Sequence, residues 1–165
     1  MLKRSLVLLS VLMIVVVFGC NNQTSDNRSL KEIAFTDKRI RLGSIECRVI
    51  DEKLLDALAA LKDFAPQFHL SLQSGSNAVL KAMNRKYSRE EYLRKCELIY
   101  SKFPVAAITT DIIAGVCGET EEDFCDSLSI MDAAKLSRVH AFAFSPREGT
   151  KAYAMQDVPK DVKSE

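Results

Sequence analysis

The chain has 165 residues, of which 47% are hydrophobic and 27% charged, with 23 Lys and Arg against 22 Asp and Glu. This is the composition of an ordinary globular protein, and a net charge of +1 supplies no basic field that would attract nucleic acid by itself. Only two His are present, which excludes a His-rich metal centre, and the length predicts one domain of about 100–150 residues plus an appendage.

The appendage is predicted at the start of the chain. Two basic residues precede an apolar run, Leu6–Gly19, which we expect to be a hydrophobic helix shorter than the roughly 20 residues that span a bilayer. A charged start, a short apolar run and a small residue are typical of a secretory signal, and Val17-Phe18-Gly19-Cys20 resembles the bacterial lipobox. We therefore expect residues 1–20 to be a lipoprotein-like signal or membrane anchor, lipidated at Cys20, and residues 21–29 to be a polar tether. An uncleaved anchor and an accidental apolar leader are the alternatives.

From Leu30 onward, strand-like and helix-like segments alternate. No tight hairpin joins one strand to the next, so the pattern predicts βα units and a parallel α/β sheet. Four such units are half of an eight-strand barrel or part of an open doubly wound sheet. We expect four strands in chain order, with helices on one face and no closed barrel. The strands are expected at Arg39–Ile45, Phe68–Gln73, Val105–Val116 and Val139–Phe144, and the helices at Glu52–Asp63, at Asn77–Asn84, after a capping box at Ser88 and after Thr120.

Three of these strands carry a face of polar or small residues. A parallel sheet covered on both sides would be apolar on both faces. The alternation therefore predicts a lined cavity such as a barrel lumen, with a partly wet sheet face as the alternative. The faces are His69, Ser71 and Gln73 in the second strand, Thr109, Asp111 and Gly115 in the third, and Ala141, Ala143, Ser145 and Arg147 in the fourth.

The five cysteines lie at positions 20, 47, 96, 117 and 125. They form no CxxC pair and no regular spacing, which indicates neither a zinc site nor a disulfide framework. Cys96 and Cys125 lie in predicted helices, and we expect both to be small buried hydrophobic residues.

Polar residues also cluster where the predicted strands end. Because the carboxyl ends of parallel strands meet at one rim, ligands bind there in α/β proteins. A glycine turn between the third strand and the next helix lets a ligand approach the backbone closely. The rim residues are Ser44, Glu46, Gln73, Ser74, Gly75, Gly115, Gly118, Glu119, Ser145 and Arg147.

Five strings in order make the pattern far more specific. They are RIRLGSIE at 39–46, HLSLQSG at 69–75, LKAMNR at 80–85, TTDIIAG at 109–115 leading into Gly118-Glu119-Thr120, and FSPREGT at 144–150. Together they resemble the radical SAM methylthiotransferases, and RLGSIE is similar to the branch that modifies threonylcarbamoyladenosine in tRNA. The resemblance implies a partial (β/α) barrel, with residues 30–155 as its strands three to six and residues 156–165 as a polar tail.

The resemblance also implies a binding site for S-adenosylmethionine. It places Gln73 and Ser74 at the ribose and the amino acid part, and Asp111 to Gly115 along the adenine. It places Ser145 and Arg147 at the rim of the last strand. The family also holds a [4Fe-4S] cluster, which cleaves S-adenosylmethionine reductively to a radical.

The sequence departs from this family in one decisive respect. It contains no CxxxCxxC, the motif that holds the cluster. The family's N-terminal domain and its RNA-binding domain have no counterpart either, which counts against tRNA as a partner. We therefore expect a truncated methylthiotransferase that binds no cluster and is inactive alone, at a membrane or, as in the family, in the cytoplasm. The alternatives are a membrane-anchored non-enzymatic lipoprotein, a subunit completed by a partner chain, and a broken gene without a stable product.

Overall fold

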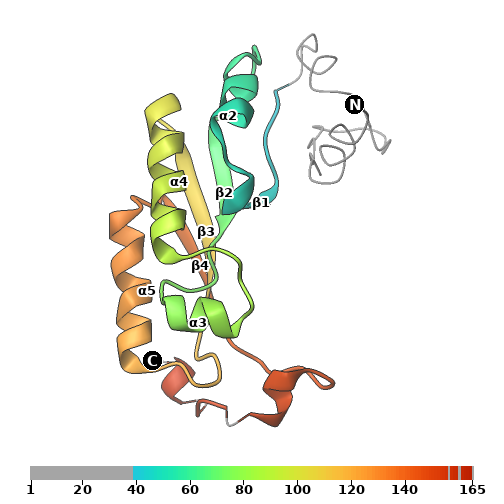
Figure 1. Cartoon of the computed structure of the whole chain (residues 1–165), viewed down its shortest axis with the longest axis vertical. Coiled ribbons are helices and arrows are strands. Elements are labelled where there is room, and N and C mark those ends of the chain that lie inside the picture. Colours follow the sequence, from blue (N-terminus) through green and yellow to red (C-terminus); the bar gives the residue numbers. More distant parts are fainter. Residues whose placement is uncertain (1–38, 156, 160, 165) are drawn as a thin grey trace, which may run out of the picture.

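The computed structural model describes residues 39–155, 157–159 and 161–164, and it contains one parallel sheet with helices packed on it (Figure 1). The predicted hydrophobic helix, the tether and Cys20 lie outside the described residues. Among those residues, no helix combines the length and the apolar character needed to cross a membrane.

The sheet has four strands in the order β1-β2-β3-β4, and every neighbouring pair is parallel. This confirms the predicted parallel sheet in chain order. β1 and β4 are the edges of the sheet in the described part of the chain. The strands are β1 (Ser44–Glu46), β2 (Gln67–Ser71), β3 (Ala107–Ala114) and β4 (Arg138–Ala143).

The third strand is shorter than the apolar run that predicts it. Val105 is 86% exposed, and the strand begins at Ala107, because the run includes the loop that enters the sheet. The predicted first strand is also shorter. Before Ser44 it pairs only through an isolated bridge between Ile40 and Phe64.

Each helix begins at a side chain that caps it. Asp51 accepts a hydrogen bond from Leu54 N, and Ser88 accepts one from Glu91 N. At Ser88 only the serine half of the predicted capping box is present, whereas at Thr120 the reciprocal pair with Asp123 is complete. The helices are α2 (Glu52–Ala59), α3 (Asn77–Ala82), α4 (Arg89–Lys102) and α5 (Glu121–Ala133), with 3-10 turns η1 (Cys47–Val49), η2 (Lys151–Ala154) and η3 (Val162–Ser164).

One hydrophobic core lies between the sheet and the helices. Phe68 and Leu70 of β2 point into it, together with Leu55 of α2, Tyr92 of α4 and Ile130 of α5, and all five are fully buried. Because α2, α4 and α5 share this core, they cover the same face of the sheet. The other face is left to polar side chains, as the alternation predicts.

The residues of β4 that lie on the polar face of the sheet differ from those predicted. Asp111 pairs with His140 and Thr109 with Arg138, and residues in register share a face of the sheet. The polar side of β4 is therefore Arg138 and His140, whereas Ala141 and Ala143 lie on the helix side. Sequence alternation shows that two faces exist but leaves open which one packs on the helices.

The two helical cysteines also differ. Cys96 in α4 is buried, as predicted, but Cys125 in α5 is exposed. The buried stripe of α5 runs through Ser127 and Ile130, and Cys125 lies about 200° around the helix from Ser127.

Candidate functional site

The rim at the carboxyl ends of β2 and β3 is held together by backbone pairing that continues past the strands. Gln73 N donates to Asp111 O over 2.9 Å, and Ile113 N donates to Gln73 O over 2.8 Å. Gln73 has φ of 75°, so the chain turns away from the sheet immediately after this pairing. The structure therefore brings three predicted site residues, Gln73, Asp111 and Gly115, to one rim.

The loop after Gln73 is fastened to α5. Ser74 is fully buried, and its Oγ lies 3.3 Å from Ser127 Oγ, while Gly75 N donates to Ser127 Oγ over 2.8 Å. Ser76 Oγ donates to Asp123 Oδ1 over 2.5 Å. The hydroxyl of Ser74 is thus engaged with the helix layer, so it holds the loop in position.

A second clamp fixes the same loop from the side of α4. The Arg89 guanidinium donates to Gly75 O over 3.1 Å and to Asp126 O over 2.6 Å, and it also reaches Ser129 Oγ over 2.7 Å. Loop, α4 and α5 are therefore locked to one another at the rim.

The glycine turn after β3 is built around Glu119. Gly115 has φ of 75°, a conformation that favours glycine. Its N donates to Glu119 Oε2 over 2.5 Å, and Val116 N donates to the same oxygen over 3.3 Å. The other oxygen, Oε1, is buried and has no hydrogen-bond partner among the described residues. Burial raises the pKa of Glu119, and the two N–H donors offset part of that effect.

Lys163, in the tail, fills the space beside this turn. A side-chain carbon at Gly115 would lie only 2.6 Å from Lys163 Cγ. The ammonium donates to Phe144 O over 2.9 Å and to Asp157 Oδ1 over 2.5 Å, and its side chain is only 6% exposed. The tail predicted to be a polar extension thus packs onto the rim.

Ser145 and Arg147 lie just beyond β4. Phe144 N donates to Ala114 O over 2.8 Å, so the chain leaves the sheet next to Gly115. Both predicted residues are exposed, and the backbone oxygen of Arg147 accepts from Thr150 in a turn. The structure brings Ser145 near the rim. Among the described residues, the side chain of Arg147 makes no contact with Asp111.

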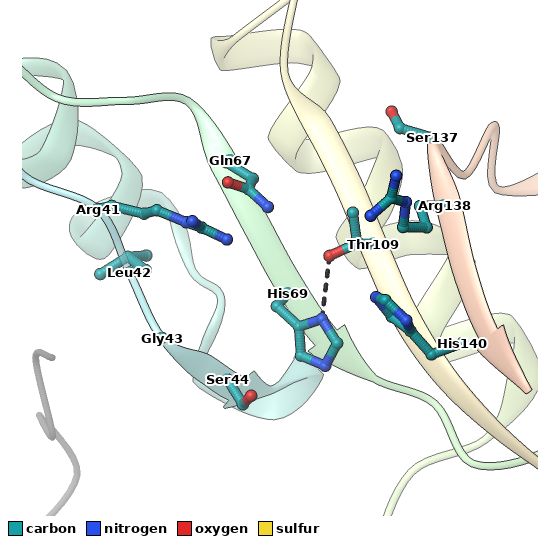
Figure 2. A pocket seen from close by; sticks show the side chains of 10 residues that line it. All are labelled: Arg41, Leu42, Gly43, Ser44, Gln67, His69, Thr109, Ser137, Arg138 and His140. Atoms are coloured by element: carbon teal, nitrogen blue, oxygen red, sulfur yellow. Dashed lines mark hydrogen bonds between the residues drawn. The ribbon is translucent and has the colours of Figure 1, made fainter. Parts of the chain in front are cut away.

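A second polar region lies at the amino ends of the strands (Figure 2). The alternation predicted a lined cavity on the face of His69 and Thr109, but sequence reasoning missed the contribution of Arg41, Arg138 and His140. A cavity of about 630 Å³ opens on the face opposite the helices. Alternation through β4 was the available signal, but the face of that strand was assigned one residue out of phase. The lining residues are Arg41, Leu42, Gly43, Ser44, Gln67, His69, Thr109, Ser137, Arg138 and His140.

His69 is held in a hydrogen-bonded chain on this face. Its Nδ1 lies 2.9 Å from Thr109 Oγ1, and its Nε2 lies 3.2 Å from Asp111 Oδ2. Asp111, predicted to contact a cofactor, therefore has its carboxylate engaged with His69 in this structure.

Two of the described cysteines, Cys47 and Cys96, are poor metal donors. Burial raises the pKa of Cys47 and of Cys96 from 9.0 to about 12, so both stay neutral thiols at neutral pH, whereas thiolates bind iron and zinc. Within residues 39–155 and the described tail, no three His, Cys, Asp or Glu side chains are grouped to hold a metal ion.

Comparison with known proteins identifies relatives of the chain. The Radical SAM superfamily matches residues 14–131. The tRNA-2-methylthio-N(6)-dimethylallyladenosine synthase of Alkaliphilus oremlandii is 44% identical over 129 residues, which are 78% of this chain and 27% of that protein. The protein of the same name from Geobacillus thermodenitrificans is 43% identical over 128 residues, 77% of this chain and 24% of that one.

The fold also has a solved counterpart. Coproporphyrinogen III oxidase (HemN) from Escherichia coli, a radical SAM enzyme, superposes with a TM-score of 0.55 at 21% identity, over 66% of this chain and 24% of that one. This is a likeness of fold. The chain spans about a quarter of the length of the curated relatives above. The superfamily match begins at residue 14, inside the expected leader, and gives the signal sequence no support.

Proposed function

The chain belongs to the radical SAM superfamily, and we propose that its described part is the half of a tRNA methylthiotransferase barrel that holds the adenosine end of S-adenosylmethionine. The similarity to tRNA-methylthiolating enzymes at 44% identity supports the reaction class. The observation that supports the site most directly is the glycine turn at Gly115, here called the glycine cradle, which lies at the rim where β3 ends beside Gln73.

The cradle suits a flat ring lying against the backbone. Gly115 has no side chain, and the space beside it is now filled by the methylenes of Lys163. Glu119 Oε1 has no hydrogen-bond partner in the described part of the chain, which leaves one buried acceptor in the same turn. We assign the adenine to the strand end from Asp111 to Gly115, and the ribose to the vicinity of Gln73. Ser145 borders the site from β4.

Ser74 and Arg147 have different parts in this proposal. Ser74 acts through its backbone, since its hydroxyl is engaged with α5. Arg147 is exposed and able to approach a ligand only from the outside of the rim.

The residues present do not fit the family's iron–sulfur cluster. In the family, S-adenosylmethionine bound to that cluster supplies a carbon radical, and closely spaced Cys thiolates hold the cluster. Here the sequence has no CxxxCxxC, and the buried thiols of Cys47 and Cys96 are protonated at neutral pH. We propose that this polypeptide binds the nucleoside but does not cleave S-adenosylmethionine alone.

The nucleoside site is tested with S-adenosylhomocysteine, which needs no cluster to bind. Calorimetry should detect weak binding to the full chain and its loss in Gly115→Ala. Gly118→Ala is the matched control, because Gly118 has a similar φ of 83° but open space around it. Equal loss in both variants, or no binding to the wild type, would contradict the site.

The cluster proposal has a separate test. Anaerobic reconstitution with iron and sulfide, followed by dithionite, should yield neither a stoichiometric cluster nor deoxyadenosine. Formation of both would make the chain a minimal radical enzyme.

The RNA substrate is proposed only as a class of modified adenosine, without choosing between the two branches of the family. The RLGSIE string is similar to the threonylcarbamoyladenosine branch, whereas the relatives above carry the dimethylallyladenosine name. For an enzyme completed by a partner chain, we propose an N6-substituted adenosine of tRNA as substrate, with the dimethylallyl type favoured by these relatives. Mass spectrometry of tRNA nucleosides from cells with and without the chain distinguishes the two.

Completion by a partner chain is a second candidate. It is favoured by the sheet edges β1 and β4, each paired on one side within the described residues. Co-purification with a polypeptide that carries CxxxCxxC would support it. Lipidation at Cys20 stays a prediction, and equal labelling of wild type and Cys20→Ser by a fatty-acid analogue would contradict it.

A further inference from the structure

The cavity at the amino ends of the strands lies away from the rim to which S-adenosylmethionine is assigned. Ser44, Gln67, Thr109 and Arg138 come from the first half of their strands, whereas Gln73 and Gly115 follow the strands. Its volume of about 630 Å³ is within the range of small-molecule sites, roughly 300–1,000 Å³. The cavity therefore needs an explanation that the rim does not provide.

Two arginine side chains extend over this cavity from opposite sides. Figure 2 shows the side chains of Arg41, before β1, and Arg138, at the start of β4, extending inward over the middle strands. β1 and β4 are three strand spacings apart, roughly 14 Å, and both side chains extend inward across this gap. Among the described residues neither one has an ion-pair or hydrogen-bond partner.

The remaining lining is rich in hydrogen-bond donors and contains no carboxylate. Ser44 and Ser137 contribute hydroxyl groups, Gln67 an amide and His140 an imidazole. The acidic residues of this sheet face, Glu46 and Asp111, lie further along the strands toward their carboxyl ends. Charge is thus separated along the face, with the positive half at the cavity.

The two histidines form the boundary between these halves. His69 and His140 lie with ring centroids 6.2 Å apart, side by side on β2 and β4 across β3. Both nitrogens of His69 are engaged, with Thr109 and Asp111, which fixes that ring as a wall of the cavity. His140 has no such pair among the described residues and faces the cavity from β4.

Two guanidinium groups without an ion-pair partner in the described part of the chain, surrounded by hydrogen-bond donors, select an anion. Arg offers a planar fork that binds phosphate oxygens in pairs, and such charge-assisted bonds are about twice as strong as neutral ones. The polar lining disfavours an apolar ligand, and the positive charge disfavours a metal cation. We propose that this cavity binds a phosphate group, held between Arg41 and Arg138 and bordered by His69 and His140.

The two histidines make the test specific, because the chain has no others. In the ¹⁵N-labelled full chain the imidazole nitrogens of His69 and His140 give two sets of signals. Inorganic phosphate, added at constant pH and ionic strength, should shift both sets saturably. Chloride at the same ionic strength should leave them in place. Equal shifts with chloride, or none with phosphate, would overturn the proposal.

Variants locate the site. Arg41→Gln and Arg138→Gln should each weaken phosphate binding by about three- to tenfold, since each removes one exposed charge. Arg94→Gln is the control, because Arg94 is exposed on α4, on the other face of the sheet. Circular dichroism verifies that each variant is folded. If Arg94→Gln weakens binding as much as the other two, the cavity is not the site.

A further arm distinguishes the source of the phosphate. A short single-stranded RNA of mixed sequence is titrated in place of inorganic phosphate. Shifts of both histidines by RNA, abolished in the double variant of Arg41 and Arg138, would identify an RNA backbone. Shifts by inorganic phosphate alone would identify a small phosphate-bearing ligand. Because the phosphate titration contains no nucleoside, failure of the nucleoside-binding test leaves this proposal unaffected.

Discussion

The side chain of Lys163 lies across Gly115, so that its Cγ takes the place where any side-chain carbon of residue 115 would be. Its ammonium is anchored beyond the turn on Phe144 O and Asp157. The tail therefore covers the part of the rim assigned to the adenine (Figure 1).

Lys163→Ala should increase the affinity for S-adenosylhomocysteine, because a ligand at Gly115 would no longer have to displace the lysine. The expected gain is about three- to tenfold, as for a site that is open between a third and a tenth of the time. Calorimetry measures it. Lys53→Ala, an exposed position on α2, is the control, and an unchanged or weaker affinity in Lys163→Ala would contradict the covering role.

Thr110→Val should destabilise the sheet even though the two side chains have the same shape. Thr110 is fully buried, and its Oγ1 donates to Leu70 O over 2.5 Å and accepts from Leu72 N over 3.0 Å. The valine leaves a buried N–H without a partner, which costs about 1–3 kcal/mol. Urea unfolding measures the loss. Thr110→Ser keeps the hydroxyl and should recover most of it, and equal losses in both variants would refute the argument.

Gly75→Ala should be more destabilising than Gly118→Ala. A Cβ at Gly75 would lie 2.5 Å from Asp126 O and 2.6 Å from Ser127 Cα, both backbone atoms of α5. At Gly118 no atom lies within 4 Å, and only its φ of 83° opposes a side chain, at about 1–2 kcal/mol. Thermal unfolding compares the two variants. A smaller loss for Gly75→Ala would show that α5 is able to move away from the loop.

Stability should fall as the pH rises above about 9. Burial raises the pKa of Cys47 and Cys96 from 9.0 to about 12, so the folded state favours the neutral thiols. Their stabilising contribution is complete below the unfolded value and is lost as the pH rises toward the folded value. At pH 10 each thiol accounts for about 1 kcal/mol of the loss.

Urea unfolding at pH 8 and pH 10 checks this dependence. Cys47→Ala and Cys96→Ala should each reduce the difference between the two pH values. Cys125→Ala should leave the difference unchanged, because Cys125 is exposed. A difference that none of the three variants alters would assign the alkaline loss to other groups.

Local pattern was sufficient for the elements and their order. The N-caps at Ser88 and Thr120 and the strand at Thr109–Ile113 depend on neighbours in the chain, so they could be predicted without the fold. The absence of hairpins between strands likewise predicted the parallel sheet that is observed. Gln73 and Gly115 were expected at one rim because parallel strands end on the same side.

The polar face of β4 and the exposure of Cys125 depended on which side of the strand or helix packs against the core. When neither face of a strand is strongly apolar, the sequence does not show which face packs on the core. In β4, only the register of Asp111 with His140 shows that Arg138 and His140 face the cavity. The exposure of Cys125 was decided in the same way, by the rotation of α5 on the sheet.

The sequence by itself therefore determined the strands, the caps, the parallel order and the family resemblance, because these follow from short-range periodicity and ordered motifs. The tertiary structure alone decided that Ser74 is fastened to α5 and that Lys163 covers Gly115. It also decided that Arg41 and Arg138 line one cavity. Each of these pairs joins residues tens of positions apart, and their placement depends on how the layers pack, which no local pattern records.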